Sequence, residues 1–346
     1  MTAVSLVIAA ALVAGLPYLV GIGWQEIFAE LAAVRPAMLV LIIPLWLLTL
    51  LAYAYVLKSS LPGLTLPQGL TLNAAGSAVS NMLPFGGAAG VALTFAMARS
   101  WGHRTSPIAA STLVTGVWNV FARLLLPAVG LAGLVLAGRL PGQRVTFAAV
   151  TGIVLIVAIV VLGVVALRWP PAGIWLGHGV DRLARLLPRR IRPPRDAAGR
   201  AFLRLHNAVA DICERAWGRI TAGMAAYIVL QYALFVACLY ATGGVLPAVA
   251  VSLAAYALGR VLTSVMVTPG GFGISETGTV ALLVQLGMPP GPATAGTLLF
   301  AVFTFVLEIP AGGAAWAAWS LNRRWRQPPP RAATVEHHPV RTAHEG

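Results

Sequence analysis

Apolar runs long enough to cross a bilayer recur along almost the whole chain. A helix of about twenty apolar residues spans the hydrocarbon core of a membrane. Runs of this kind lie at 2–23, 37–57, 107–137, 146–168, 221–241, 247–268 and 293–320. The first run begins without the Lys/Arg segment that opens a secretory signal, so we interpret it as a span. The pattern predicts an all-α, polytopic membrane protein.

Two further apolar stretches are short, and Gly and Pro interrupt them. One runs over 68–83, is broken at 84–87 (PFGG) and continues over 88–99; the other follows 247–268, is broken at 269–273 (PGGFG) and continues over 274–287. Gly and Pro together end a helix, and at membrane depth such a break is tolerated only inside protein or facing water. We therefore expect about eight long transmembrane helices plus two short Gly/Pro-broken helices, re-entrant or half-length.

The one long polar segment, 169–220, separates the runs 146–168 and 221–241. Apolar residues recur within it at helical spacing, over 176–187 and again over 202–216, with arginines on the other faces. This spacing predicts amphipathic helices on the membrane surface, either as a solvated connector or as a sensor of lipids or of a partner. We take 1–326 as a single transmembrane domain and the Pro-rich tail, 327–346, as disordered.

Composition supports the membrane assignment and removes other protein classes. Hydrophobic residues make up 58% of the chain and charged residues 10%, with a mean hydropathy of +0.83, whereas soluble domains carry about 25% charge. Disordered chains, coiled coils and collagen-like fibres are excluded by these values. Cys213 and Cys238 are the only cysteines, too few for a disulfide framework or a cysteine-rich metal site.

The excess positive charge lies in loops and predicts the orientation of the protein. Residues 168–219 hold eleven arginines against four acidic residues, which supplies +7 of the formal net charge of +14. Cytoplasmic loops carry such an excess, so we expect 169–220 and both termini in the cytoplasm and the protein in the inner (cytoplasmic) membrane. Basic loops also attract anionic lipid headgroups, and we expect no nucleic-acid partner.

An internal repeat relates the two broken stretches. A shift of 185 residues aligns them without a gap, pairing Pro84 with Pro269 and Gly86 with Gly271. Ten of forty positions are then identical between 84–123 and 269–308, where about four are expected by chance. The repeat units lie around 68–137 and 253–320.

The relative direction of the two repeat units depends on how the short helices are counted. If both cross the membrane, ten traverses result, the repeats are inverted, and the basic tail lies on the same side as 169–220. If both are re-entrant while their neighbours cross, the repeat is parallel and the tail faces outside, against the positive-inside rule. We favour the inverted arrangement, in which Gly/Pro-interrupted segments mark the central site of a transporter.

Charged residues inside the spans are the first candidates for that site. Arg123 and Glu308 are paired by the repeat near the middle of long spans, and Arg260 and Glu276 also lie within apolar segments. Burying one such charge costs about 2.5–3.5 kcal/mol. We expect Arg123 and Glu308 to lie near each other, touching or sharing a ligand. The arginines suit a phosphate or serve as ion-pair partners, and Glu276 caps its helix or binds a proton or amine.

Glycines at the two breaks are the second group of candidates. They let the backbone approach a ligand and leave the N–H groups of a helix start free for an anion, or else they serve close helix packing. These glycines are Gly86, Gly87, Gly270, Gly271 and Gly273. Asn81, Asn119 and Gln231 supply polar contacts to a ligand or hydrogen bonds between helices.

Signals of an enzyme are absent from the sequence. All six histidines lie in predicted loops or the tail without the spacing of metal ligands, and no P-loop or dinucleotide fingerprint is found. The segment 273–278 (GISETG) lacks the glycine spacing of a nucleophile elbow. We therefore predict no catalytic residues, no metal site and no cofactor.

The residues around the breaks resemble a known family. The segments 81–90 (NMLPFGGAAG) and 268–278 (TPGGFGISETG), with Arg99 and Arg123 between them, are similar to the flippase-like integral membrane family. Its best-known members are the transmembrane regions of lysylphosphatidylglycerol synthases. Asn81 and Arg99 fit the family pattern near the first motif. Members often carry an acidic residue beside the span arginine, where this chain has Ala122.

This resemblance implies lipid translocation, or the membrane half of an envelope-lipid system. It does not imply aminoacyl transfer, because the soluble catalytic domain of the synthases has no counterpart in 327–346. Our first hypothesis is a transporter that moves an anionic lipid or lipid-linked headgroup. The alternatives are a membrane scaffold that docks an envelope-lipid enzyme through its basic loop, and an intramembrane lipid-modifying enzyme.

Overall fold

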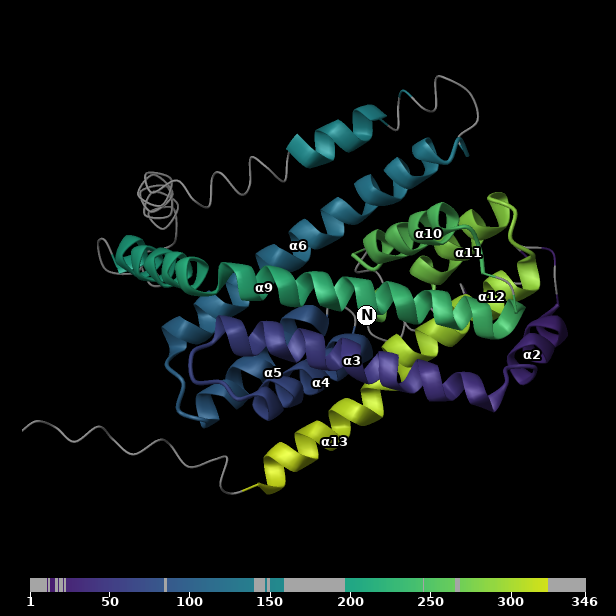
Figure 1. The fold of residues 1–346 in the computed structure, drawn as a ribbon. Coiled ribbons are helices and arrows are strands. Elements are labelled where there is room, and N and C mark those ends of the chain that lie inside the picture. Colours follow the sequence, from purple (N-terminus) through teal and green to yellow (C-terminus); the bar gives the residue numbers. More distant parts are fainter. Residues whose placement is uncertain are drawn as a thin grey trace, which may run out of the picture.

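The computed structural model describes residues 23–83, 86–139, 150–158, 197–244, 246–264 and 268–322, with isolated positions between 11 and 21 and at 147. The regular structure in these ranges is helical (Figure 1). The first half contains α2 (Trp24–Ala32), α3 (Pro36–Ser60), α4 (Leu66–Met82), α5 (Gly86–Ser100) and α6 (Thr105–Leu136). The second contains α9 (Ala197–Gly243), α10 (Val249–Leu262), η1 (Pro269–Gly271), α11 (Ile274–Gln285), α12 (Pro290–Ala301), η2 (Val302–Val306) and α13 (Glu308–Leu321).

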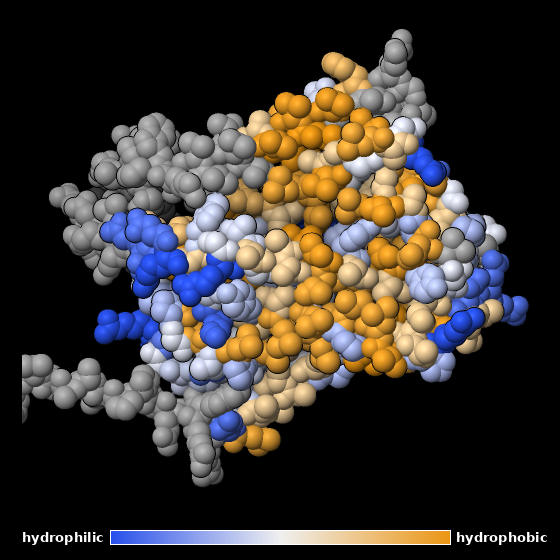
Figure 2. Space-filling view, in the orientation of Figure 1, coloured by the Kyte–Doolittle hydropathy of each residue, from blue (hydrophilic) through white to orange (hydrophobic). Residues whose placement is uncertain are grey.

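Several of these helices are long and apolar enough to cross a membrane. Within the described ranges, four meet the criterion: Pro36–Ser60, Thr105–Leu136, Asn207–Gly243 and Pro290–Leu321. Figure 2 shows a belt of hydrophobic surface between two hydrophilic ends, as expected where lipid replaces water. The chain is a multi-pass membrane protein. The predicted spans 2–23 and 146–168 lie mostly outside the described residues, so the expected total of about eight long helices stays a prediction.

Both predicted breaks are present, and each broken stretch folds into a helical hairpin. The first break lies at 83–85, between α4 and α5; the second lies at 263–273, between α10 and α11. In the first hairpin the helices touch at Gly90, where an added Cβ would lie 2.7 Å from the Gly76 carbonyl oxygen. In the second, Gly259 lies against Thr279. Small residues allow this close approach, so each short helix has its own partner.

The two hairpins begin at opposite ends of the molecule. Ser60, at the end of α3, hydrogen-bonds Ser111 near the start of α6 (2.7 Å). Trp319, near the end of α13, donates to the hydroxyl of Ser100 at the end of α5 (3.0 Å). The base of α4–α5 therefore lies where α3 and α13 end. The base of α10–α11 lies at the other end, where Gly133 of the last turns of α6 packs on Ala250. Both breaks therefore face the middle of the molecule.

The described part of the polar segment, 197–220, belongs to α9 and is continuous with the predicted span 221–241. Ile212 and Ala216 are buried and pack with Val114 and Trp118 of α6, and the Trp118 indole donates to the Thr221 hydroxyl (3.0 Å). The spacing in 202–216 thus marked a helix correctly. Residues 207–220, however, form the end of a spanning helix packed on α6, and not a separate surface helix. The stretch 176–187 and the tail 327–346 lie outside the described residues.

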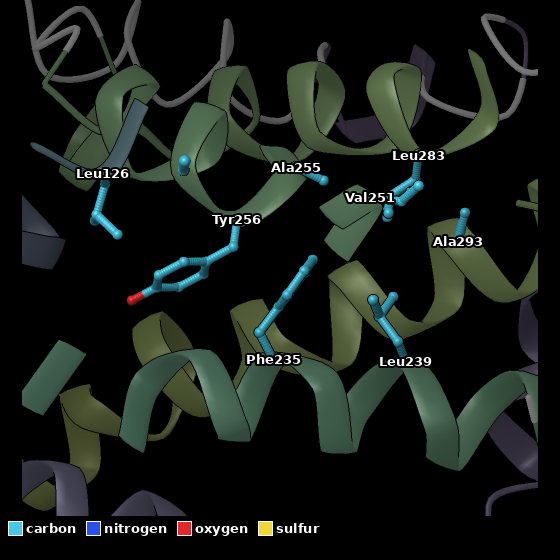
Figure 3. Close-up of a cluster of buried hydrophobic side chains, with 9 residues drawn as sticks. Leu126, Phe235, Leu239, Val251, Ala255, Tyr256, Leu283 and Ala293 are labelled. Atoms are coloured by element: carbon cyan, nitrogen blue, oxygen red, sulfur yellow. The ribbon is translucent and has the colours of Figure 1, made fainter. Parts of the chain in front are cut away.

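The second half of the chain has a tightly packed core. It is formed by Phe235 and Leu239 of α9 with apolar residues of α10, α11 and α12 (Figure 3). The Phe235 ring centroid lies 5.8 Å from that of Tyr256 and 5.3 Å from that of Phe300. Near this core the last spanning helix contains a π-helical turn, η2, in which Leu307 N–H donates to Val302 C=O (2.8 Å). Single π-helical turns are rare and frequently lie at functional sites, and this one ends just before Glu308.

Candidate functional site

A cavity of about 450 Å³ lies inside the first half of the molecule, bounded by α3, α4, α5 and α6. Its far wall comes from Tyr227 and Gln231 of α9, from α10 and the second break, and from Thr304 to Glu308. Residues three or four apart share one face of a helix, which explains why polar side chains of two helices reach the same space. They are Asn73, Ser77, Ser80 and Asn81 of α4, and Ser111, Thr112, Thr115, Asn119 and Arg123 of α6.

The two breaks meet at the wall of this cavity. Asn81, at the end of α4, donates from Nδ2 to the Thr304 carbonyl oxygen (3.3 Å) and to Glu308 Oε2 (3.2 Å). Gly270 lies against Asn81 and Phe305, and its φ of +60° is one that side chains rarely allow. Gly271, at φ +78°, lies so close to the Thr263 backbone that an added Cβ would be 2.6 Å from its Cα. The second break thus depends on glycine.

Arg123 is held by neutral partners. Its Nε donates to Asn119 Oδ1 (3.3 Å), and its Nη1 donates to the hydroxyls of Thr263 (3.2 Å) and Ser264 (3.1 Å). The direct contact with Glu308 that the repeat suggested is not formed; instead both residues face the same cavity. Glu308 lies within electrostatic range of Arg260 and accepts a hydrogen bond from Asn81 Nδ2.

Arg260 lies within electrostatic range of the Tyr227 hydroxyl, which accepts a hydrogen bond from Gln231 Nε2 (3.1 Å). The charged residues that line the cavity are therefore Arg123 and Arg260 against Glu308. This leaves one uncompensated positive charge at membrane depth, where burial of a lone cation is costly. An anion would offset it.

Two polar atoms in the cavity wall lack a hydrogen-bond partner among the described residues. They are Gln231 Oε1 and Thr268 Oγ1, in side chains that are 3% and 1% exposed. A buried polar group without a partner costs about 1–3 kcal/mol. Both residues line the cavity, so a ligand or water inside it can satisfy them.

The structure gathers most of the predicted site residues around this cavity. Those that line it are Asn81, Gly86, Gly87, Arg123, Arg260, Gly270, Gly271 and Glu308. Gly86 also packs on the backbone of Val79 and Ser80, so the packing interpretation holds for it too. Gly87 is exposed and open to the cavity.

Three predicted residues do not line the cavity. Glu276 is buried and accepts hydrogen bonds from the Gly273 N–H and the Ser275 hydroxyl (2.9 Å). It caps α11, the structural one of the two roles considered for it. Gly273, at φ +89°, forms the turn before that helix. Arg99 is exposed on the last turn of α5.

Several residues of the cavity were not predicted as site residues. Ser77 and Ser80 recur with Asn73 and Asn81 at helical spacing in an otherwise apolar stretch. That polar stripe is a signal that periodicity alone offers. Tyr53 and Tyr227 carry no such signal, because tyrosines inside apolar spans usually pack in cores or at membrane interfaces.

A second, much smaller pocket of about 30 Å³ lies on the other side of Arg260, between α10, α11 and α12. Its lining includes Ser275, Glu276, Thr279, Thr297, Phe300 and Thr304. The 185-residue shift pairs these with Gly90, Val91, Thr94, Thr112, Thr115 and Asn119, and all six line the large cavity. The two pockets thus occupy corresponding places in the two repeat units, one open and one nearly filled.

Comparison with known families identifies the chain. The family described as the lysylphosphatidylglycerol synthase TM region matches residues 3–312, which contain the cavity and both breaks. No curated protein matches the chain. Because the match covers nearly the whole sequence, the chain belongs to the lysylphosphatidylglycerol synthase transmembrane-region family.

Proposed function

We propose that this protein is a flippase-like transporter that moves a lipid with an anionic headgroup across the cytoplasmic membrane. The family ties this multi-pass membrane protein to lipid handling. The observation that carries the proposal is the cavity at membrane depth, lined by two arginines and one glutamate. The proposal assigns no catalytic step and no cofactor.

The headgroup chemistry follows from the donors. A guanidinium presents planar N–H groups that match two phosphate oxygens. The hydrogen-bond partners of Arg123 among the described residues are all neutral, so a ligand can replace them. An anion beside Arg123 and Arg260 offsets the positive charge that Glu308 leaves uncompensated in the cavity. The acyl chains remain in the bilayer, so the protein has only the headgroup to carry through the hydrocarbon.

The hairpins support an inverted repeat. A hairpin returns the chain to the end from which it came, so α4–α5 and α10–α11 leave the number of crossings unchanged. Three crossings then separate them: α6, the predicted span 146–168 and α9. The repeats run in opposite directions with re-entrant halves, the segment 169–220 and the tail share the cytoplasmic side, and ten full traverses are not required.

An inverted pair of pockets suits alternating access. In this mechanism, the open first cavity and the nearly filled second pocket exchange states while the central residues stay in place. Four residues line both pockets, as expected for the central residues of an alternating-access cycle: Arg260, Thr263, Thr304 and Phe305. A scaffold that only docks an enzyme through its basic loop has no need of a second pocket.

Transport can be measured in vesicles. The purified protein is reconstituted in phosphatidylcholine vesicles with a trace of tail-labelled phosphatidylglycerol, and dithionite reports the label that reaches the outer leaflet. We expect Arg123→Gln to slow this movement about tenfold, since a hydrogen bond to a charged group is worth about 1.5–3 kcal/mol. Arg139→Gln, an exposed arginine just after α6, is the matched control and should match wild type. Wild-type protein that moves no lipid would favour the scaffold.

A further inference from the structure

The seam between α5 and α6 is closed at one end and open at the other. Near the turn that joins them, Met97 and Trp101 of α5 and its following turn pack with Ile108 of α6 in one buried cluster. Farther from the turn, Gly87 and Val91 of α5 and Gly116 of α6 line the cavity and are exposed as well. The cavity therefore reaches the molecular surface through this seam.

Among the described residues, α5 with α6 and α3 with α6 touch at few places around the cavity, and α9 packs closely on both members of the second pair. α4 packs closely on α3, α5 and α13, and α6 packs closely on α9 and α10, whereas α5 and α6 touch at few places. The corresponding seam of the second repeat unit, between α11 and α12, is filled. Its counterpart of Gly116 is Ala301, which is 1% exposed.

Gly116 is not explained by helix packing. Glycine is disfavoured inside a helix relative to alanine, and such a residue usually permits a close contact or a positive φ. Gly116 lies inside α6 without a positive φ, and an added Cβ would meet no atom of the described residues within 4 Å. The missing side chain instead keeps the seam wide.

The two sides of the seam differ in polarity. Its inner side carries polar residues of α6, Thr112, Asn119 and Arg123, on the cavity wall. Its outer rim carries Leu113 and Val120 of α6, exposed at 45% and 53% on the lipid-facing surface. An amphiphile with a polar head inside and apolar chains outside fits this change of polarity.

We propose that the α5–α6 seam is a lateral portal occupied by the acyl chains of a membrane lipid while its headgroup lies beside Arg123. This inference rests on the proposed transport function and adds its route of entry from the bilayer. The lipid enters sideways, between Gly87 and Gly116, without passing through the aqueous ends of the protein.

The test uses a matched pair of glycines. Gly116→Trp fills the seam, whereas Gly313→Trp places the same side chain on α13, at a helical glycine that is also exposed and without a neighbour within 4 Å. Neither substitution displaces a packed residue, so both variants should insert and fold. Thermal unfolding in detergent checks this directly.

The first readout maps bound acyl chains in the full-length protein. Phosphatidylglycerol with a photoreactive diazirine in its acyl chain is added to vesicles, illuminated, and its adducts are located by mass spectrometry. Adducts are expected on 86–100 and 105–123 in wild type and in Gly313→Trp, and should be lost in Gly116→Trp. Adducts on these segments that persist in Gly116→Trp, or that lie elsewhere in wild type, would overturn the portal.

The second readout is transport in the dithionite assay. Gly116→Trp is expected to reduce lipid movement to the rate of protein-free vesicles, and Gly313→Trp to retain the wild-type rate. If Gly116→Trp transports normally, the portal is wrong while transport stands. If wild type does not transport, the proposed function fails, and the adduct map alone decides whether acyl chains occupy the seam.

Discussion

The charged side chains of the cavity differ in how they are compensated. Arg260 and Glu308 interact electrostatically with each other, whereas Arg123 relies on an amide and two hydroxyls. Removing one partner of a buried pair leaves a lone charge, which costs more than removing both. Arg260 and Glu308 should therefore behave as a unit, and Arg123 should be the arginine free to bind a ligand.

A double-mutant cycle tests the Arg260–Glu308 pair. Arg260→Leu and Glu308→Leu should each lower the stability of the protein in detergent, because each leaves an opposite charge in the cavity with less compensation. The double variant should lose clearly less than the sum of the two, with a coupling energy of about 0.5–3 kcal/mol. Thermal unfolding of the four proteins provides the measurement, and strictly additive losses would contradict the electrostatic coupling of Arg260 with Glu308.

At the scale of elements, the breaks were predictable and the hairpins were not. Pro and Gly at 84–87 and 269–273 end helices by local chemistry, so the sequence shows where α5 and α11 begin. The folding of α4 on α5, and of α10 on α11, depends on contacts between glycines and neighbouring backbones that no periodicity reveals.

Contacts between separate helices, which periodicity does not reveal, also explain where the structure differs from the other predictions made from the sequence. The continuity of α9 through 207–220 is set by its packing on α6, and the π-helical turn before Glu308 has no sequence signal. Site residues were predictable where they were charges or glycines in apolar surroundings, as at Arg123, Arg260 and Glu308. The repeat pairs Arg123 with Glu308, and both face the same cavity without a direct contact, because equivalence of position does not require contact; a ligand shared by the two stays a prediction.

The packing of α13 on α4 gives a second matched comparison. Gly312 is buried so closely against Ala74 and Ala78 of α4 that a side chain has no room, whereas its neighbour Gly313 is exposed with nothing within 4 Å. Overpacking typically costs about 1–3 kcal/mol, and the cost at Gly312 should exceed that range because backbone atoms block the space.

We therefore expect Gly312→Leu to lower the unfolding temperature in detergent strongly or to prevent folding. Gly313→Leu should keep or raise it, since leucine gains up to about 1 kcal/mol of helix propensity over glycine. Fluorescence-detected size exclusion and thermal unfolding of both variants supply the measurement. Equal behaviour of the two would mean that α13 does not pack on α4 in this register.

At the scale of the whole molecule, the two ends differ in charge. Lys58, Arg99, Arg104, Arg215 and Arg219 lie at the end where α3 and α5 stop and α6 starts, against Asp211 and Glu214. At the opposite end Arg35 and Arg139 are matched by Glu26 and Glu30, which lie beside Gly291 at the start of α12. The described residues thus concentrate positive charge at one end of the molecule.

This asymmetry predicts how the protein sits in the membrane. Lys and Arg resist export, so the end that carries the excess should be cytoplasmic. The chain leaves α13 at that same end, because Trp319 bonds Ser100, and a basic tail there obeys the same rule. This orientation predicts that the first hairpin enters from the cytoplasm, that the second enters from the opposite side, and that the open cavity lies in the cytoplasmic half of the protein.

Cysteine labelling at the two ends of α6 decides the orientation. In a Cys213→Ser, Cys238→Ala background, Ser106→Cys and Ala137→Cys place single thiols at exposed positions without removing a charge. An impermeant maleimide should label Ala137→Cys in intact cells and Ser106→Cys only after permeabilisation, since α6 is long enough to cross the bilayer. The reverse pattern would invert the protein and place the open cavity outside. Labelling of both thiols in intact cells would mean that α6 does not span the membrane. Three crossings would then no longer separate the two hairpins, and the prediction that they enter from opposite sides would be wrong.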